Sequence, residues 1–171
     1  MTIIWFNGPS NRQLIHSLPR QTFELGCNFI RRHRPVDVVC AYDINTIIKI
    51  PIEDSVQYYT RPDAQYGSWN VINDPVIQST NSGLLACYVA SRKTTAPIYI
   101  VGCDWGITRQ SNFEHLYDHT ELKRKYIQPH NEFVKRVFAG KQVWVVHDQQ
   151  PDIDLPVVSV KQFKEQLEIN I

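Results

Sequence analysis

Neither charge sign predominates in this chain, and long apolar runs are missing. Its 171 residues include 18 Lys and Arg against 17 Asp and Glu, a formal net charge of +1. Proteins that bind nucleic acid polymers need a basic face, so this balance argues against a polymeric nucleic acid partner. It remains compatible with one nucleotide, because a helix start can hold a phosphate without an excess of Lys and Arg. No apolar run approaches the roughly 20 residues of a membrane helix, and we expect no membrane insertion.

The cysteines form no CxxC pair, which removes the usual spacing of a zinc site. Cys27, Cys40, Cys87 and Cys103 each lie inside or beside an apolar run, so we interpret them as small buried side chains. The first six residues lack the basic start of a signal peptide and are typical of a first strand. We therefore expect a cytoplasmic, reduced protein with no resident metal or cofactor.

Short apolar runs alternate with helical stretches along the chain. Strands are predicted at residues 2–6, 24–28, 36–42, 98–103 and 143–147, and helices at 84–91, 121–139 and 160–167. The strands are apolar throughout, which indicates burial on both faces. This predicts one α/β domain over residues 1–171, a three-layer Rossmann-like fold with a mostly parallel central sheet. Residues 61–70 are interpreted as a loop, and 149–156 as a surface loop before a C-terminal helix.

Ligands of such sheets bind outside the carboxyl ends of the strands, which directs attention to the loop after the first strand. That loop reads Asn7-Gly8-Pro9-Ser10. Gly8 leaves room for a ligand near the backbone, Pro9 stiffens the turn, and Ser10 with Gln13 predicts a capping box. The N–H groups of this helix start would suit a phosphate, but an ordinary strand-to-helix turn has the same composition. The dinucleotide fingerprint G-x-G-x-x-G and the P-loop are both absent.

Further polar residues fall at the same expected edge. Ser82 and Gly83 open a predicted helix, where they suit either a ligand or a plain N-cap cluster. Asp43 and Asp104 each follow a predicted strand. A carboxylate there can accept a hydrogen bond from a ribose, help to position a metal, or cap a neighbouring turn.

Four of these motifs carry a resemblance to known proteins. In chain order they are Asn7-Gly8-Pro9-Ser10, Cys27-Asn28, Asn81-Ser82-Gly83 and Val101-Gly102-Cys103-Asp104. Together they resemble the bacterial sialyltransferase family that uses CMP-sialic acid. They are also similar to relatives of that family, of the archaeal 6-hydroxymethylpterin diphosphokinase type, and to small phage-type proteins with similar motifs. The resemblance covers roughly residues 1–139, with a poor match between 44 and 78.

The resemblance implies a role for each matching residue. Asn7, Gly8 and Ser10 would contact phosphate or ribose, Asn28 the nucleotide, and Ser82 and Gly83 the base or phosphate. It also implies a histidine base beyond the strand that ends near Asp104, with tyrosine assisting the departing phosphate. One departure is Phe6, which stands where the family has glycine.

Three residues in the matching region suit the chemistry of transfer. Histidine exchanges protons near neutrality, since its ordinary pKa is about 6.5, so His115 or His119 could serve as the base, with a marginal preference for His119. Tyr117 could donate to a phosphate oxygen. A solvated loop with surface histidines is the alternative. The His-Glu-x-x-His order of a zinc site is lacking.

Two other clusters each have two interpretations. The basic run at residues 31–34 suits either an anionic substrate or a solvated helix end. Tyr58, Tyr59, Tyr66 and Trp69 suit either a stacking surface for a base or sugar, or core packing.

Two functions from different classes therefore stay open. The first is a nucleotide-binding, transferase-like protein that moves a glycosyl group, or a phosphoryl or diphosphoryl group, from a small activated nucleotide. The second is a non-catalytic Rossmann-like binding or interaction module of phage type, which the short chain and the lost glycine favour. One fold hosts many functions, so the fold does not choose between the two. An oligomer is compatible with either.

Overall fold

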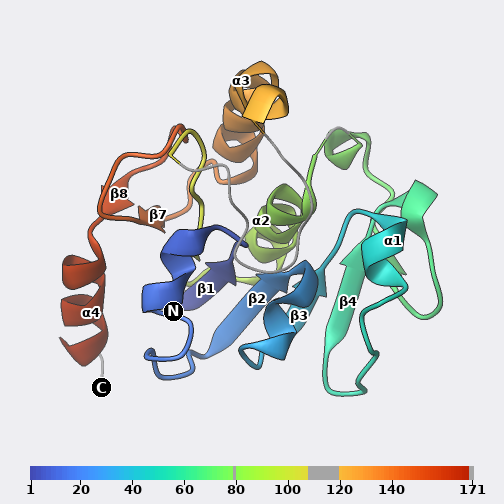
Figure 1. Cartoon of the computed structure of the whole chain (residues 1–171), viewed down its shortest axis with the longest axis horizontal. Helices are drawn as coiled ribbons and strands as arrows, with labels where there is room; N and C mark the ends of the chain where they lie inside the picture. Colours follow the sequence, from blue (N-terminus) through green and yellow to red (C-terminus); the bar gives the residue numbers. More distant parts are fainter. Residues whose placement is uncertain (79, 108–119, 170–171) are drawn as a thin grey trace.

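The computed structural model describes residues 1–78, 80–107 and 120–169. Within these residues eight strands form one parallel sheet (Figure 1). In spatial order they are β5 (Asn70–Val71), β4 (Gln57–Thr60), β3 (Val38–Cys40), β2 (Phe23–Cys27), β1 (Thr2–Trp5), β6 (Ile98–Val101), β7 (Val143–Val146) and β8 (Val157–Val158). The predicted α/β fold with a parallel central sheet is confirmed.

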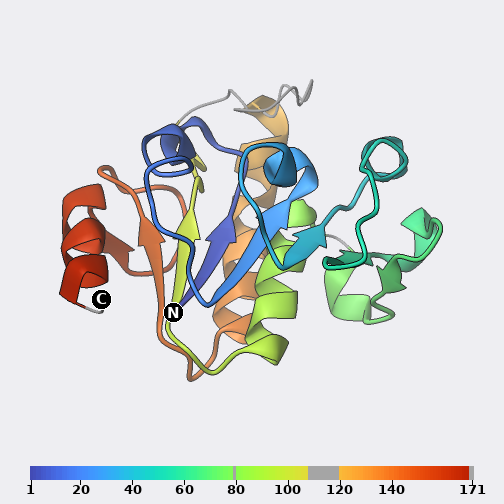
Figure 2. The ribbon, with the colours of Figure 1, turned by 90° about the horizontal axis from the view of Figure 1, so that it is seen from below.

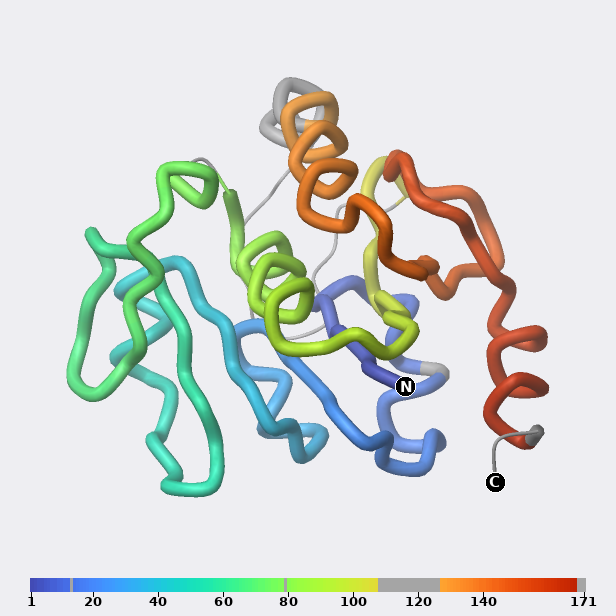
Figure 3. Tube along the Cα trace, turned by 180° about the vertical axis from the view of Figure 1, so that it is seen from behind, coloured from blue at the N-terminus to red at the C-terminus, as the bar shows by residue number. Residues whose placement is uncertain are grey.

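The helical segments cover both faces of this sheet. The α-helices are α1 (Ile44–Ile47), α2 (Ser82–Lys93), α3 (Thr120–Val137) and α4 (Val160–Ile169). Short 3₁₀ segments are η1 (Pro9–Gln13), η2 (Asn28–Arg32), η3 (Pro62–Ala64) and η4 (Pro75–Ile77). Figures 2 and 3 show α2 and α3 side by side, while α4 lies at one end of the molecule and α1 near the other.

One layer of the core lies between the sheet and the pair α2 and α3. Ile4, Leu25 and Val38 from the strands pack there against Leu85 of α2 and Phe133 of α3. All four cysteines belong to this layer as buried thiols that form no disulfide, which confirms their interpretation as small core side chains. Burial raises the pKa of the Cys87 thiol well above its usual range, because the thiolate would lose its hydration.

The second layer lies on the opposite face, where η1, η2, α1 and α4 pack. Buried between η2 and β2 is an ion pair, in which the Arg34 guanidinium bonds both oxygens of Glu24 at 2.6 and 2.7 Å. Arg34 also donates to the carbonyls of Ile15, Leu18 and Pro19, and Glu24 accepts from the Trp5 indole. These bonds anchor the segment after η1 to the sheet.

The basic run at residues 31–34 is in part a solvated helix end, because Arg31 and Arg32 lie in the last turn of η2 and Arg32 is exposed. Arg31 pairs with Glu53, Arg32 lies over the Phe29 ring, and Arg34 is the buried partner of Glu24. Two of the three arginines thus pair with carboxylates elsewhere in the chain, so their charges are matched within the protein.

The predicted boundaries differ from the structure mainly in the shortest elements. Two edge strands, β5 and β8, were not predicted; each has two residues and is defined by pairing with its neighbour. Helix α3 continues through Pro129, and Gly140, with φ of 73°, follows its end as predicted. No helix in the described part of the chain is long and apolar enough to span a membrane.

Candidate functional site

The strand order places a switch point at the centre of the sheet. The chain runs outward from β1 through β5, then returns through α2 to β6, which pairs with the other side of β1. Loops that follow the two central strands therefore leave the sheet at one place, where ligands of open parallel sheets bind. The Asn7–Ser10 turn and the loop at residues 102–107 meet there.

These two loops contact each other directly through their backbones. The Gly8 N–H donates to the Gly102 carbonyl at 2.9 Å. A Cβ on Gly8 would lie 2.3 Å from that carbonyl oxygen and 2.5 Å from Asp104 Oδ2. Gly102 has φ of 81°, a left-handed conformation that favours glycine. The space beside Gly8, expected to admit a ligand, is thus occupied by the neighbouring loop.

Ser10 has a different role from the predicted helix cap, so the capping box with Gln13 is wrong. Gly8 is the N-cap residue of η1, with no side-chain cap, and Pro9 occupies the first turn. The Ser10 N–H donates to Asp104 Oδ2 at 2.9 Å, and its hydroxyl donates to Asp104 Oδ1. The carboxylate of Asp104 therefore lies where a phosphate was expected, since both anions suit a helix start.

His147, at the end of β7, supports the same carboxylate. Its Nε2 lies 3.2 Å from Asp104 Oδ1, and its Nδ1 accepts the Gln149 N–H at 2.9 Å. Nδ1 is thus engaged with the backbone, and Nε2 is the ring nitrogen that lies toward Asp104. Both side chains are buried. Sequence reasoning missed His147, although its place just after a predicted strand was a usable signal.

Asn28 and Ser82 join across the sheet edge in a second polar cluster. The Ser82 hydroxyl donates to Asn28 Oδ1 at 2.8 Å and accepts the Tyr42 N–H at 3.1 Å. Asn28 is 8% exposed and has φ of 52°, the one left-handed non-glycine residue in the described chain. Such conformations concentrate at functional sites, where surrounding bonds hold them. No described residue accepts a hydrogen bond from Asn28 Nδ2.

The start of α2 borders this cluster. Asn81, not Ser82, is the N-cap, and its Oδ1 accepts the Leu84 N–H at 3.0 Å. The N–H groups of Ser82 and Gly83 lie in the first turn of α2, where the helix has no earlier carbonyl to accept their hydrogen bonds. Neither N–H bonds to a described residue. Gly83 is needed for packing, because a Cβ there would lie 2.6 Å from the Phe6 ring.

The remaining predicted residues fall outside these two clusters. Asp43 caps α1 by accepting the Asn45 N–H at 2.8 Å, which is one of the three roles expected of it. Asn7 Oδ1 is buried at the β1 turn without a hydrogen-bond partner in the described chain. His115, Tyr117 and His119 lie outside the described residues.

The expected aromatic stacking surface does not form as one cluster. Tyr58 and Trp69 are buried in the second core layer, with ring centroids 5.1 Å apart. Lys93 lies over the Tyr59 ring, and the Tyr66 side chain is half exposed. Core packing explains the first pair.

The fold and the polar edge define the class as an α/β protein with a Rossmann-like parallel sheet. Comparison with protein-family models, curated proteins and solved structures finds no match. Among the described residues, no group of three or more His, Cys, Asp or Glu side chains is arranged to hold a metal ion.

Proposed function

We propose that this protein binds a small nucleotide at the carboxyl edge of its sheet, with the phosphate at the start of α2. The observation that supports the proposal most is the Asn28–Ser82 cluster. It combines a left-handed asparagine held from across the sheet, an uncommitted amide donor, and two N–H groups at a helix start. Together these groups offer three donors to an anion.

A cation and a ring lie next to this cluster. The Arg61 guanidinium stacks 3.7 Å from the centroid of the Tyr42 ring, and the Tyr42 backbone bonds Ser82. Arg61 also pairs with the exposed Asp63 carboxylate at 2.8 Å, so its charge is already matched within the protein. The Asn7–Ser10 turn likewise uses its N–H groups of Gly8 and Ser10 within the protein.

For the reaction we propose transfer of a glycosyl group from the bound nucleotide, as the resemblance to sialyltransferases implies. His119 or His115 would take the proton of the acceptor hydroxyl, and Tyr117 would donate to the departing phosphate. The alternative is a binding module that holds the nucleotide without turnover. The closed β1 turn favours this alternative, because half of the expected phosphate site is occupied by Asp104.

Calorimetric titration with CMP, CDP, UDP, ADP and GDP tests the proposal. Asn28→Gly is the informative variant, because glycine tolerates φ of 52° and only the amide is lost. We expect at least tenfold weaker binding of the preferred nucleotide with a retained fold. Asn131→Ala, on α3, is the control and should bind like the native chain. If Asn28→Gly binds the nucleotide with the affinity of the native chain, the ligand lies elsewhere. If the protein binds a nucleotide but turns over none of them, the binding module is favoured.

A further inference from the structure

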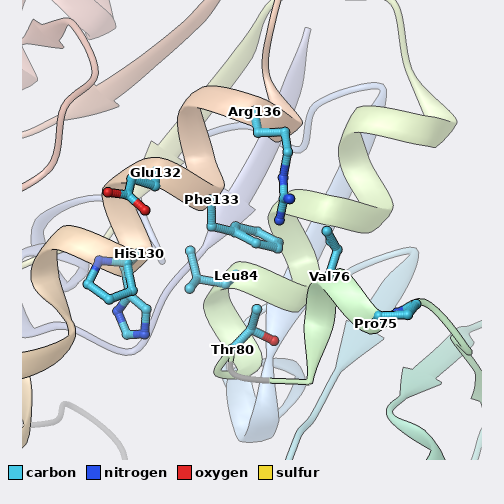
Figure 4. A pocket seen from close by; sticks show the side chains of 9 residues that line it. Pro75, Val76, Thr80, Leu84, His130, Glu132, Phe133 and Arg136 are labelled. Atoms are coloured by element: carbon cyan, nitrogen blue, oxygen red, sulfur yellow. The ribbon is translucent and has the colours of Figure 1, made fainter.

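A cavity of about 530 Å³ lies beside the α2 start (Figure 4), and neither Asn28 nor Ser82 lines it. Its walls come from η4, the first turn of α2 and α3. They are formed by Pro75, Val76, Thr80, Leu84, Pro129, His130, Glu132, Phe133 and Arg136. Ser82 and Leu84 are two residues apart, about 200° around a helix, so they face opposite sides of it. The volume is within the range of small-molecule sites.

The floor of this cavity is apolar. Leu84 and Phe133 are buried core residues with 0% and 5% exposure, and Val76 packs against the same core layer. Figure 4 shows the Phe133 ring beside Leu84 and facing Val76. A flat apolar body would bury its surface there without displacing a hydrogen-bonded group.

Arg136 supplies a positive charge at the wall. It lies four residues after Glu132, a spacing at which helical ion pairs usually form, yet the two make no ion pair within 4 Å in the described chain. Figure 4 shows the guanidinium extended alongside Phe133 toward Val76, with the Glu132 carboxylate directed away from it. Glu132 instead accepts from Gln128 at 3.2 Å. Hydrogen bonds from Tyr88 and the Val76 N–H lower the pKa of the nearby Asp74 carboxylate, and the charges of Arg92 and Arg136 also lower it, so Arg136 lies close enough to Asp74 to interact with it.

His130 closes the other end without adding charge. Burial lowers its pKa to about 4, so the ring is neutral near pH 7. Its centroid lies 5.2 Å from that of Trp105, the residue after Asp104. The cavity therefore borders the loop at the switch point as well as the α2 start.

We infer that this cavity binds an organic acid with an apolar ring, with the ring on Leu84 and Phe133 and the carboxylate on Arg136. Arginine is suited to this role because its planar guanidinium matches a carboxylate in two hydrogen bonds. This cavity is a second site beside the proposed nucleotide site, because Leu84 faces the opposite side of α2 from Ser82.

Titration of the ¹⁵N-labelled protein with naphthalene-2-carboxylate tests the site, followed by amide chemical shifts. We expect shifts at Thr80, Leu84 and Phe133, and about tenfold weaker binding in Arg136→Gln. Lys135→Gln, which removes the adjacent charge that pairs with Asp154, should bind like the native chain. Neutral naphthalene-2-methanol should bind the native chain and Arg136→Gln equally, which also checks that the variant retains its cavity.

Three results would overturn the inference. They are unchanged cavity amides at millimolar acid, equal affinity of the acid in Arg136→Gln and the native chain, and displacement of the acid by saturating CMP. Binding of the acid to a protein that binds no nucleotide would leave the cavity assigned and remove the proposed function instead. Binding of CMP with no response to the acid would support the proposed nucleotide site and overturn the assignment of the cavity.

Discussion

Asp104→Asn should destabilise the fold more than any other single change at the switch point. The carboxylate accepts two hydrogen bonds, from the Ser10 N–H and the Ser10 hydroxyl, His147 Nε2 lies 3.2 Å from its Oδ1, and Asp104 is 5% exposed. An asparagine has one acceptor oxygen, which can serve the Ser10 hydroxyl at the Oδ1 position. Its NH₂ group would then face the Ser10 N–H. Both groups are donors, so neither would have an acceptor at this buried position.

The magnitude follows from that geometry. A buried donor left without a partner costs about 1–3 kcal/mol, and hydrogen bonds to a charged acceptor contribute about 1.5–3 kcal/mol each. We expect Asp104→Asn to lower the free energy of unfolding by about 3 kcal/mol. Ser10→Ala removes only the hydroxyl bond and should cost about 1–2 kcal/mol, because the Ser10 N–H keeps its partner. Since domains of this kind are stable by about 5–15 kcal/mol, both variants should fold.

Urea unfolding followed by circular dichroism measures these changes. The exposed Asp63→Asn variant is the matched control, and it should change the unfolding free energy by less than about 0.5 kcal/mol. The double variant should be less destabilised than the sum of the two single variants, because they share one interaction. A smaller loss for Asp104→Asn than for Ser10→Ala would refute the assignment of both Ser10 hydrogen bonds to this carboxylate.

Three further predictions concern other parts of the fold. Gly8→Ala should cost about 1–3 kcal/mol in urea unfolding because its Cβ would overlap Gly102 and Asp104, and a native-like midpoint would show that the loops separate without penalty. Arg34→Met should lower the free energy of unfolding by about 3–5 kcal/mol, because it leaves Glu24 charged and buried. Arg20→Gln, which removes an exposed ion pair with Asp37, should cost less than about 1 kcal/mol. Similar losses in the two variants would contradict the greater importance of the buried pair. The pKa of His130 is lowered to about 4 in the folded chain, from about 6.5 in the unfolded chain. Between these pH values the unfolded chain binds more protons than the folded chain, so the stability that the neutral His130 contributes declines as pH falls from about 6.5 to 4. His130→Gln should therefore lose less stability than the native chain between pH 7 and 5, and identical losses would oppose this assignment.

The main strands could be predicted because their signal is local. Residues 2–6 and 98–103 are continuous apolar runs, and both become central strands buried on both faces. The edge strands β5 and β8 carry no such signal, since each consists of two residues whose assignment depends on a neighbour. The start of α2 was predicted within two residues, although its cap is Asn81.

The details of the site depended on contacts that local patterns do not encode. Ser10 has the composition of a helix cap, but its partner Asp104 lies 94 positions away. Asn28 and Ser82, singled out by resemblance, are 54 positions apart and do meet. His147 was missed because a lone histidine after a strand is informative only once Asp104 is known to lie opposite it.

The most direct test of the nucleotide site is an amide chemical-shift titration with the nucleotide that binds best in calorimetry. The proposed site predicts the largest shifts at Asn28, Tyr42, Ser82 and Gly83, with smaller changes at Ser10, whose N–H is already bonded to Asp104. In Asn28→Gly these shifts should require at least tenfold more nucleotide. Saturable shifts centred on the Asn7–Ser10 turn, or none at millimolar nucleotide, would contradict a phosphate site at the start of α2.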